Sequence, residues 1–251
     1  MLEYLNCAMD IGELMLINGA EVHRVEDSVR RMCSAFGYDR IDVFIITSSM
    51  VVTVFKGEES LTQTRRIVVS TTDLERIHRL NDLSRKICMH QFKTADEIKA
   101  EIQSIVRQKN YPLWLECLAY AVISAAFAIF FGGNLADGGV AFFIGLFARV
   151  LIYFADRARM NKMFIKFISC FFATMLAIVS TRIGLVDSVD KALIGNIMTL
   201  IPGVGLTNAL RDLFTGDSIA SLLRFIEAVL TALAIAAGYF VATFLLGGVL
   251  Q

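Results

Sequence analysis

The chain has 251 residues, of which 56% are hydrophobic, and its 24 basic and 24 acidic side chains give a formal net charge of zero. Its mean hydropathy of +0.61 exceeds the usual value for a soluble domain, which must keep a wet surface. A balanced charge offers no basic field for a nucleic acid, so we expect no nucleic-acid partner. Five scattered cysteines without a C-x-x-C pair predict a reduced compartment and no disulfide framework.

Charged residues are concentrated before Pro112, whereas the later sequence contains apolar stretches of a dozen or more residues without charge. This asymmetry predicts two domains in different solvents: a cytosolic domain over residues 1–111 and a membrane domain over residues 112–251. No basic segment followed by an apolar core comes after Met1, so we expect no cleaved signal peptide and a cytosolic N-terminus.

The first domain is predicted to start with a helix and to end with helices. Apolar residues recur at helical spacing from Leu2 to Met32, which predicts one long or kinked helix with a possible break at Asn18-Gly19. The segments Thr72-Asp-Leu-Glu75 and Thr94-Ala-Asp-Glu97 have the capping-box pattern, in which a hydroxyl and a carboxylate each bind an unpaired backbone N–H. Two further helices are therefore expected.

Three short β-branched or aromatic runs lie between these helices: Ile41–Thr47, Met50–Phe55 and a run centred on Ile67-Val68-Val69. Polar turn residues separate them, which predicts a small antiparallel meander. The first two runs are apolar on both faces, so helices should cover the sheet. The expected fold class is thus an N-terminal cytosolic α+β domain, in the order α-β-β-β-α-α, on a multi-pass α-helical membrane protein.

The first domain has no pattern that indicates catalysis or a metal. Its three histidines are not at ligand spacing, and no phosphate-binding loop or nucleophile elbow occurs, so we expect no metal and no cofactor. The densest polar segment contains Glu21, His23, Arg24, Glu26, Asp27, Arg30 and Arg31. Either a solvated helix face with internal ion pairs or a functional cluster around Glu21, Arg24 and Glu26 would explain it.

About five membrane-spanning helices are predicted, over residues 113–131, 138–154, 163–183, 192–210 and 218–250. The first follows Pro112, whose missing N–H costs nothing at a helix start. The loop at 132–139 carries no Lys or Arg, whereas the segment 155–166 carries four, which places the latter in the cytosol. We therefore expect a protein of the cell inner membrane with its N-terminus in the cytosol and its C-terminus outside.

The fourth predicted span is interrupted by Pro202, Gly203 and Gly205. Such a break leaves peptide groups unpaired, so within a membrane it survives only against protein or a wet cavity, and transporters place substrates at such breaks. A proline kink that only shapes packing is the alternative. The residues expected to line a substrate path are Pro202, Gly203, Gly205, Thr207, Asn208, Arg211, Asp212, Asp217, Arg224 and Glu227.

Each charged member of this set also has a simpler interpretation. Arg211 and Asp212 could mark the cytosolic end of the span, and Asp217 could cap the next helix. Arg224 and Glu227 lie one turn apart and could pair with each other. Arg149, in the second span, could extend its charge to the membrane surface and is left out of the predicted site.

Two segments resemble the threonine/serine exporter family: Asn18-Gly-Ala-Glu-Val-His-Arg-Val-Glu-Asp27, and the Pro-Gly…Thr-Asn-Ala-Leu-Arg-Asp-Leu…Gly-Asp block at 202–217 with Arg224 and Glu227 after it. The resemblance covers nearly the whole chain. The family pattern matches Gly19, Ala20, Arg24, Val25 and Glu26 in the first domain, and Pro202, Gly203, Thr207, Asn208, Arg211, Asp212, Gly216, Asp217, Arg224 and Glu227 in the second. Gly205 stands at a more variable position.

The resemblance implies export driven by the proton gradient, of threonine and serine in fused members and of C4-dicarboxylates such as succinate in some split ones. A chain that ends at 251 resembles the split type, which works with a separate small membrane subunit of four or five spans. We therefore expect an oligomeric exporter rather than an enzyme. Arg211 would attract a carboxylate substrate, and Asp212, Asp217 or Glu227 would carry the coupling proton.

Two other hypotheses stay open from the sequence. One is a membrane-anchored enzyme with its chemistry around Glu21, His23, Arg24 and Glu26, although no nucleophile–base pair is visible. The other is a ligand sensor or assembly module in the first domain that gates the membrane part.

Overall fold

A computed structural model describes residues 2–68, 71–92, 94–108, 111–186 and 188–247. The chain forms two compact units. The first contains Met1–Lys109 together with Val204–Phe225, and the second contains Asn110–Gly203 together with Ile226–Gln251. A segment of about twenty residues from the C-terminal third thus belongs to the same compact unit as the N-terminal elements.

Two helices, α1 (Leu2–Ile17) and α2 (Val22–Ala35), form where one long or kinked helix was expected. The break falls at the predicted Asn18-Gly19. Gly19 adopts φ +92°, a left-handed conformation that residues with a Cβ rarely adopt. A Cβ there would also come within 2.9 Å of the Thr71 carbonyl oxygen, so both backbone angle and space favour glycine.

The three strands are β1 (Arg40–Ile46), β2 (Ser49–Lys56) and β3 (Glu59–Arg66), paired antiparallel in the order β1-β2-β3. This confirms the small antiparallel sheet, but the predicted centre of the third strand was wrong. A two-residue turn with Gly57 at φ +59° pairs Lys56 with Glu59, so β3 starts immediately. As an edge strand it needs no apolar run. Val68 is 78% exposed after the strand ends, and Val69 lies outside the described residues.

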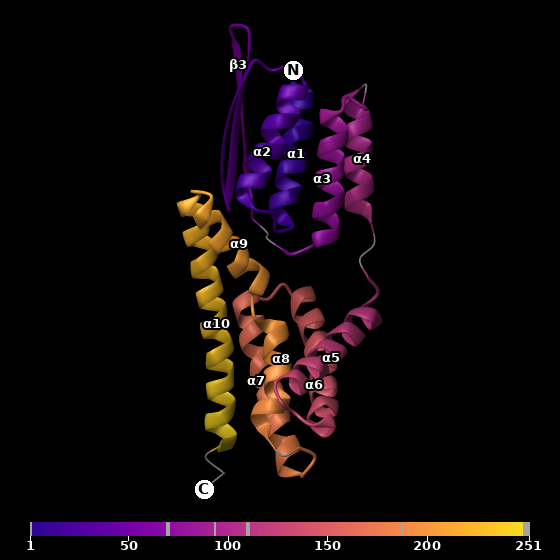
Figure 1. The fold of residues 1–251 in the computed structure, drawn as a ribbon, viewed down its shortest axis with the longest axis vertical. Helices are drawn as coiled ribbons and strands as arrows, with labels where there is room; N and C mark the ends of the chain where they lie inside the picture. Colours follow the sequence, from indigo (N-terminus) through magenta and orange to yellow (C-terminus); the bar gives the residue numbers. More distant parts are fainter. Residues whose placement is uncertain (1, 69–70, 93, 109–110, 187, 248–251) are drawn as a thin grey trace. The chain divides into compact units, whose positions relative to one another are not determined.

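The first unit is layered, with the sheet on one side of α1 and α2 and the helices α3 (Leu74–Cys88) and α4 (Ala95–Arg107) on the other (Figure 1). Met50, Val52 and Val54 alternate along β2 and are fully buried, so helices cover one face of the sheet. Together with apolar residues of α1 to α4 they form one core.

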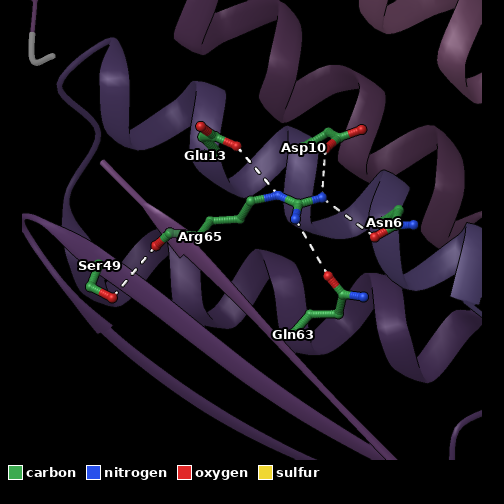
Figure 2. Close-up of polar contacts among 6 residues, drawn as sticks. All are labelled: Asn6, Asp10, Glu13, Ser49, Gln63 and Arg65. Carbon is green, nitrogen blue, oxygen red and sulfur yellow. Dashed lines mark hydrogen bonds and ion pairs between the residues drawn. The ribbon is translucent and has the colours of Figure 1, made fainter. Parts of the chain in front are cut away.

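Arg65 joins the edge strand β3 to the helix layer (Figure 2). Its guanidinium lies 3.4 Å from Asn6 Oδ1, 3.5 Å from Asp10 Oδ1 and 3.6 Å from Glu13 Oε2. These three α1 residues are spaced by about one helical turn, so they present one polar stripe to the strand. Gln63 Oε1 accepts a further bond from Arg65 at 3.4 Å.

The helix starts confirm one sequence prediction and correct another. The Thr94–Glu97 capping box is present, with both reciprocal bonds formed. At α3 the N-cap is Asp73 rather than Thr72, and its carboxylate accepts from Arg76 N at 3.0 Å. A carboxylate one residue later caps the helix equally well, because Asp and Thr are both preferred N-caps.

The second unit consists of α5 (Leu113–Phe130), α6 (Leu135–Arg157), α7 (Lys162–Arg182), α8 (Val189–Leu200) and most of α10 (Ser218–Gly247). By length and composition, α5, α6, α7 and α10 are each able to cross a membrane. The helix pair α8 and α9 (Gly203–Phe214), bent by 53° at its break, would be a fifth span if it counts as one. Residues 248–250 of the last predicted span lie outside the described residues.

Small residues let the helices of this unit approach closely. A Cβ at Gly195 of α8 would lie 2.1 Å from the Ser124 carbonyl oxygen of α5, and one at Gly145 of α6 would lie 2.5 Å from Ser124 Oγ. Contacts of this kind are typical of helix packing in membranes, where dispersion rather than the hydrophobic effect holds helices together.

Candidate functional site

The break between α1 and α2 leaves the carbonyl groups of residues 17–20 without helical partners, and other parts of the first unit bind each of them. The N–H groups of Thr71 and Asp73 donate to the first two carbonyls at 2.6 and 3.0 Å. Asn208 Nδ2 donates to the third at 3.1 Å, and Arg224 Nη2 donates to the fourth at 2.7 Å. Two of these four donors come from the segment that follows the Pro202 break.

We name the resulting cluster the polar junction; it consists of Gly19, Ala20, Glu21, Asn208, Arg211, Asp212 and Arg224. Arg211 Nη1 lies 3.0 Å from Glu21 Oε1. Arg224 Nε lies 3.6 Å from Asp212 Oδ2; the Asp212 side chain is buried at 1% exposed, and the Arg224 side chain is 12% exposed. The two segments that carry the family resemblance therefore meet in space, although about 190 residues separate them in the sequence.

The hairpin of α9 and α10 positions the C-terminal half of the junction. Gly216 turns the chain at φ +95°, and Asp217 N donates to the Asp212 carbonyl at 2.9 Å. Ser221 Oγ donates to the Ala209 carbonyl at 2.6 Å, which ties the two helices together. The buried Ala209 leaves room for this close approach. Asp212 and Arg224 thus project from two helices held in fixed register.

Glu26 lies beside the junction and has a structural partner of its own. Its Oε1 accepts a hydrogen bond from Ile45 N at 2.9 Å, which joins α2 to β1. Burial raises the pKa of Glu26, the Ile45 bond opposes that shift, and the neighbouring Asp217 carboxylate adds to it. Asp217 Oδ2 is buried and accepts no hydrogen bond from any described residue. The carboxylates of Glu26 and Asp217 therefore lie close enough to influence each other.

Several other predicted site residues do not belong to the polar junction. Pro202 lies between α8 and α9, and Gly203, Gly205 and Thr207 occupy the first turns of α9. Glu227 is exposed in the second unit, and its carboxylate has no hydrogen bond or ion pair among the described residues. The suggested pairing of Arg224 with Glu227 is not formed, because Arg224 is bound by Asp212 and the Ala20 carbonyl.

Arg24, the remaining predicted residue, is exposed on α2 and lines two cavities of the first unit. The smaller, of about 130 Å³, lies at the α1–α2 break beside Glu21 and Asn208. The larger, of about 350 Å³, lies between α2 and α3. No group of three or more acidic, histidine or cysteine residues within the described ranges is arranged to hold a metal ion.

Sequence reasoning missed one charged pair in the second unit. Arg149 of α6 and Glu116 of α5 form an ion pair, with side chains 16% and 27% exposed. The guanidinium also lies 5.6 Å from the centre of the Tyr120 ring. One Glu and one Arg in two separate apolar helices were the available signal, because charges in such helices usually find each other.

Several long apolar helices joined to a unit with buried charges define a multi-pass membrane protein. A family model described as "Putative threonine/serine exporter" matches residues 6–246, and the chain belongs to this family. The protein is therefore a membrane transporter and not an enzyme, and the resemblance found in the sequence is confirmed.

Named relatives agree with this class. A protein from Klebsiella aerogenes named "Probable succinate transporter subunit YjjP" is 26% identical over 236 residues, which cover 93% of this chain and 89% of that protein. Its namesake from Escherichia coli K12 is 23% identical over 90% of this chain and 88% of its own length. The "Threonine/serine exporter" of Corynebacterium glutamicum is 23% identical over 93% of this chain but only 49% of its own length. No solved structure shows a significant match.

Proposed function

We propose that this chain is one subunit of a secondary active exporter of small hydrophilic metabolites in the cell inner membrane, with its N-terminus in the cytosol. A C4-dicarboxylate such as succinate is the first candidate substrate, and threonine or serine is the second. Two relatives that this chain covers to 89% and 88% of their length carry both "succinate" and "subunit" in their names, which supports this order. A second small membrane subunit of four or five spans would complete the transporter.

The polar junction is the observation that carries the transport mechanism we propose. Arg211 has a side chain that is 60% exposed, so its guanidinium is able to attract a carboxylate even while it contacts Glu21. Asp212 is buried, and its ion-pair partner Arg224 lies 3.6 Å away, so we propose this carboxylate as the proton carrier. A substrate carboxylate would compete with Glu21 for the Arg211 guanidinium, and a proton would compete with Arg224 for the Asp212 carboxylate, so each would change the charge that the other meets in the polar junction.

We further propose that the predicted path residues act together. The Pro202–Gly203 break would let α9 tilt relative to α8, and Gly205, Thr207, Asn208 and the Arg211–Asp212 pair would follow that motion. Asp217 and Glu227 are the other candidate proton carriers, and Arg224 is the cation that holds Asp212. The cluster Glu21, Arg24 and Glu26 would form the side of the junction that stays with α2.

An efflux assay tests the proposal. Vesicles would contain this chain together with the proposed small membrane subunit of four or five spans, and would be loaded with labelled succinate or threonine. An acidic outer medium should speed efflux of one of these substrates, and a protonophore should remove the acceleration. Arg211→Ala and Asp212→Asn should each reduce the accelerated efflux at least about tenfold, because each removes a charge-assisted contact.

Arg107→Ala is the matched control, since it removes an exposed arginine at the end of α4, away from the junction. Its efflux should equal that of the unmodified protein, at equal amounts of protein in the vesicles. Unchanged efflux in both junction variants would remove Arg211 and Asp212 from the mechanism. Efflux that ignores the proton gradient would contradict the driving force, and no efflux of either substrate would contradict the substrate class.

A further inference from the structure

The larger of the two cavities that Arg24 lines is a groove of about 350 Å³ between α2 and α3. We name it the α2–α3 groove; its lining residues are Arg24, Asp27, Ser28, Arg31, Asn81, Ser84, Arg85, Cys88 and Met89. Each helix contributes four residues at i, i+3, i+4 and i+7, which is the spacing of a single helix face. The groove is therefore built from two facing stripes rather than from a loop.

Small side chains keep the groove open. Ser28 and Ser84 occupy facing positions where packed helices usually carry larger apolar residues. Directly next to them in sequence, Val29 and Leu83 are buried in the core and hold the two helices together. Ser84 Oγ is bound to the Asn81 carbonyl at 2.7 Å, so the floor is itself ordered. A space of this kind is preformed, which lowers the entropy cost of binding a ligand.

The groove has an excess of positive charge. Its three guanidinium groups face one carboxylate, that of Asp27, which pairs with Arg31 at 3.0 Å. Neither the Arg24 nor the Arg85 guanidinium has a hydrogen bond or ion pair with any described residue. Elsewhere on α3, by contrast, Arg79 is paired with Glu75 at 2.8 Å. Two unpaired guanidinium groups thus border one small cavity.

The remaining lining residues supply hydrogen bonds but no reactive group. The Asn81 side-chain amide and the Ser28 hydroxyl have no hydrogen bond with other described residues, so both are available to a ligand. Burial raises the pKa of the Cys88 thiol, which keeps it protonated and weakly nucleophilic near neutral pH. The groove therefore has the chemistry of a binding site and not of a catalytic one.

We propose that the α2–α3 groove binds a small organic or inorganic anion with two negative charges, held between the guanidinium groups of Arg24 and Arg85. Guanidinium forks bind carboxylate and phosphate oxygens in the same bidentate manner, so a dicarboxylate and a phosphate share the required chemistry. A volume near 350 Å³ lies at the small end of the roughly 300–1,000 Å³ range of ligand pockets, which indicates a metabolite-sized ligand.

The position of the groove gives binding a regulatory consequence. Arg24 and Asn81 line both this groove and the smaller cavity at the α1–α2 break, where Glu21 and Asn208 belong to the polar junction. A ligand that draws Arg24 toward Arg85 changes the charge that faces Glu21, and hence the contact of Glu21 with Arg211. The binding site itself does not depend on the proposed transport function.

Calorimetric titration of the full chain in detergent tests the site, with succinate and inorganic phosphate as separate probes. We expect at least one probe to bind, and Arg24→Gln and Arg85→Gln each to weaken that binding about tenfold or more. Lys86→Gln is the matched control, because it removes an equal charge beside Arg85 but outside the lining, and it should change binding less than twofold. The substituted side chains are all exposed, so the variants should fold.

The outcomes are distinct. Binding that both arginine variants weaken supports the proposal: with succinate alone it identifies a dicarboxylate site in the groove, and with phosphate alone it identifies a phosphate site there. Binding of neither probe, equal weakening by Lys86→Gln, or unchanged binding in both arginine variants would overturn it. Because no transport is measured, a chain that exports without binding here refutes this site alone, and a chain that binds without exporting refutes only the proposed function.

Discussion

Glu26 shows how one buried carboxylate makes the stability of the first unit depend on pH. Burial raises its pKa, so the folded state binds the proton more tightly than the unfolded chain does. The contribution of Glu26 to stability is therefore greatest at and below the ordinary Glu value of 4.5, and it falls as the pH rises through the raised pKa. A carboxylate in a salt bridge, whose pKa is lowered, would behave in the opposite way.

Glu26→Gln should remove the loss of stability that ionisation of Glu26 causes as the pH rises. The amide oxygen of Gln still accepts the hydrogen bond from Ile45 N, but the side chain carries no charge to bury. We expect the variant to unfold at a higher temperature than the unmodified protein at pH 7 to 8, and the difference to shrink toward pH 4.5. Thermal unfolding of the full chain across this range measures it. Glu75→Gln, on the exposed surface of α3, should show no such trend. A variant less stable at pH 7, or a difference independent of pH, would contradict the assignment.

At the scale of elements, the sequence predicted what depends on local chemistry. The capping box of α4, the start of α5 after Pro112 and the break at Gly19 follow from residues within a few positions of each other. The centre of β3 could not be found in this way, because an edge strand of polar residues gains its place from pairing with β2 rather than from an apolar pattern. The register of a strand is set by its contacts with the neighbouring strand, and local sequence patterns do not contain that information.

The same distinction applies to the candidate site. Sequence patterns selected Arg211, Asp212 and Arg224, yet nothing in the sequence indicated that they contact the α1–α2 break. Contacts between segments about 190 residues apart produce no periodicity or motif spacing from which they could be predicted. The ion pair of Glu116 and Arg149 escaped for a related reason, since Arg149 alone could have extended its charge to the membrane surface.

The contact of α5 with α8 gives a prediction for the second unit. Because a Cβ at Gly195 would lie 2.1 Å from the Ser124 carbonyl oxygen, which is backbone and cannot rotate away, Gly195→Ala must push the two helices apart. We expect a loss of about 1–3 kcal/mol, the usual cost of overpacking. A lower unfolding temperature in detergent measures it. Gly139→Ala in α6 is the control, since nothing lies within 4 Å of its Cβ position. Equal effects of the two substitutions would contradict the close contact.

At the scale of the whole molecule, each of the two compact units is built from two separate segments of the sequence. The chain passes between its two units at residues 109–110, 203–204 and 225–226, so α10 begins in the first unit and continues in the second. Ala220 of the segment Val204–Phe225 is buried in the same core as the apolar residues of Met1–Lys109. The residues that contact the α1–α2 break therefore lie on α9 and at the start of α10, and α10 continues in the chain into the second unit.

Removal of residues 1–110 should consequently unfold the start of α10. In the full chain the Arg224 side chain is 12% exposed and bound to Asp212 and the Ala20 carbonyl, so trypsin should cut after it slowly. A fragment that starts at Tyr111 lacks the Ala20 acceptor and the packing around Ala220, and its Asp212–Arg224 pair becomes exposed to water and weak. We expect cleavage after Arg224 to be at least about tenfold faster in the fragment than in the full chain.

Arg159, between α6 and α7, is exposed and belongs to the second unit, so cleavage there should proceed at the same rate in both proteins. Addition of residues 1–109 as a separate chain should restore protection of Arg224. Equal cleavage after Arg224 in the fragment and the full chain would show that the C-terminal segment is stable without the N-terminal elements, and the proposed link between the junction and the membrane spans would then have no structural basis.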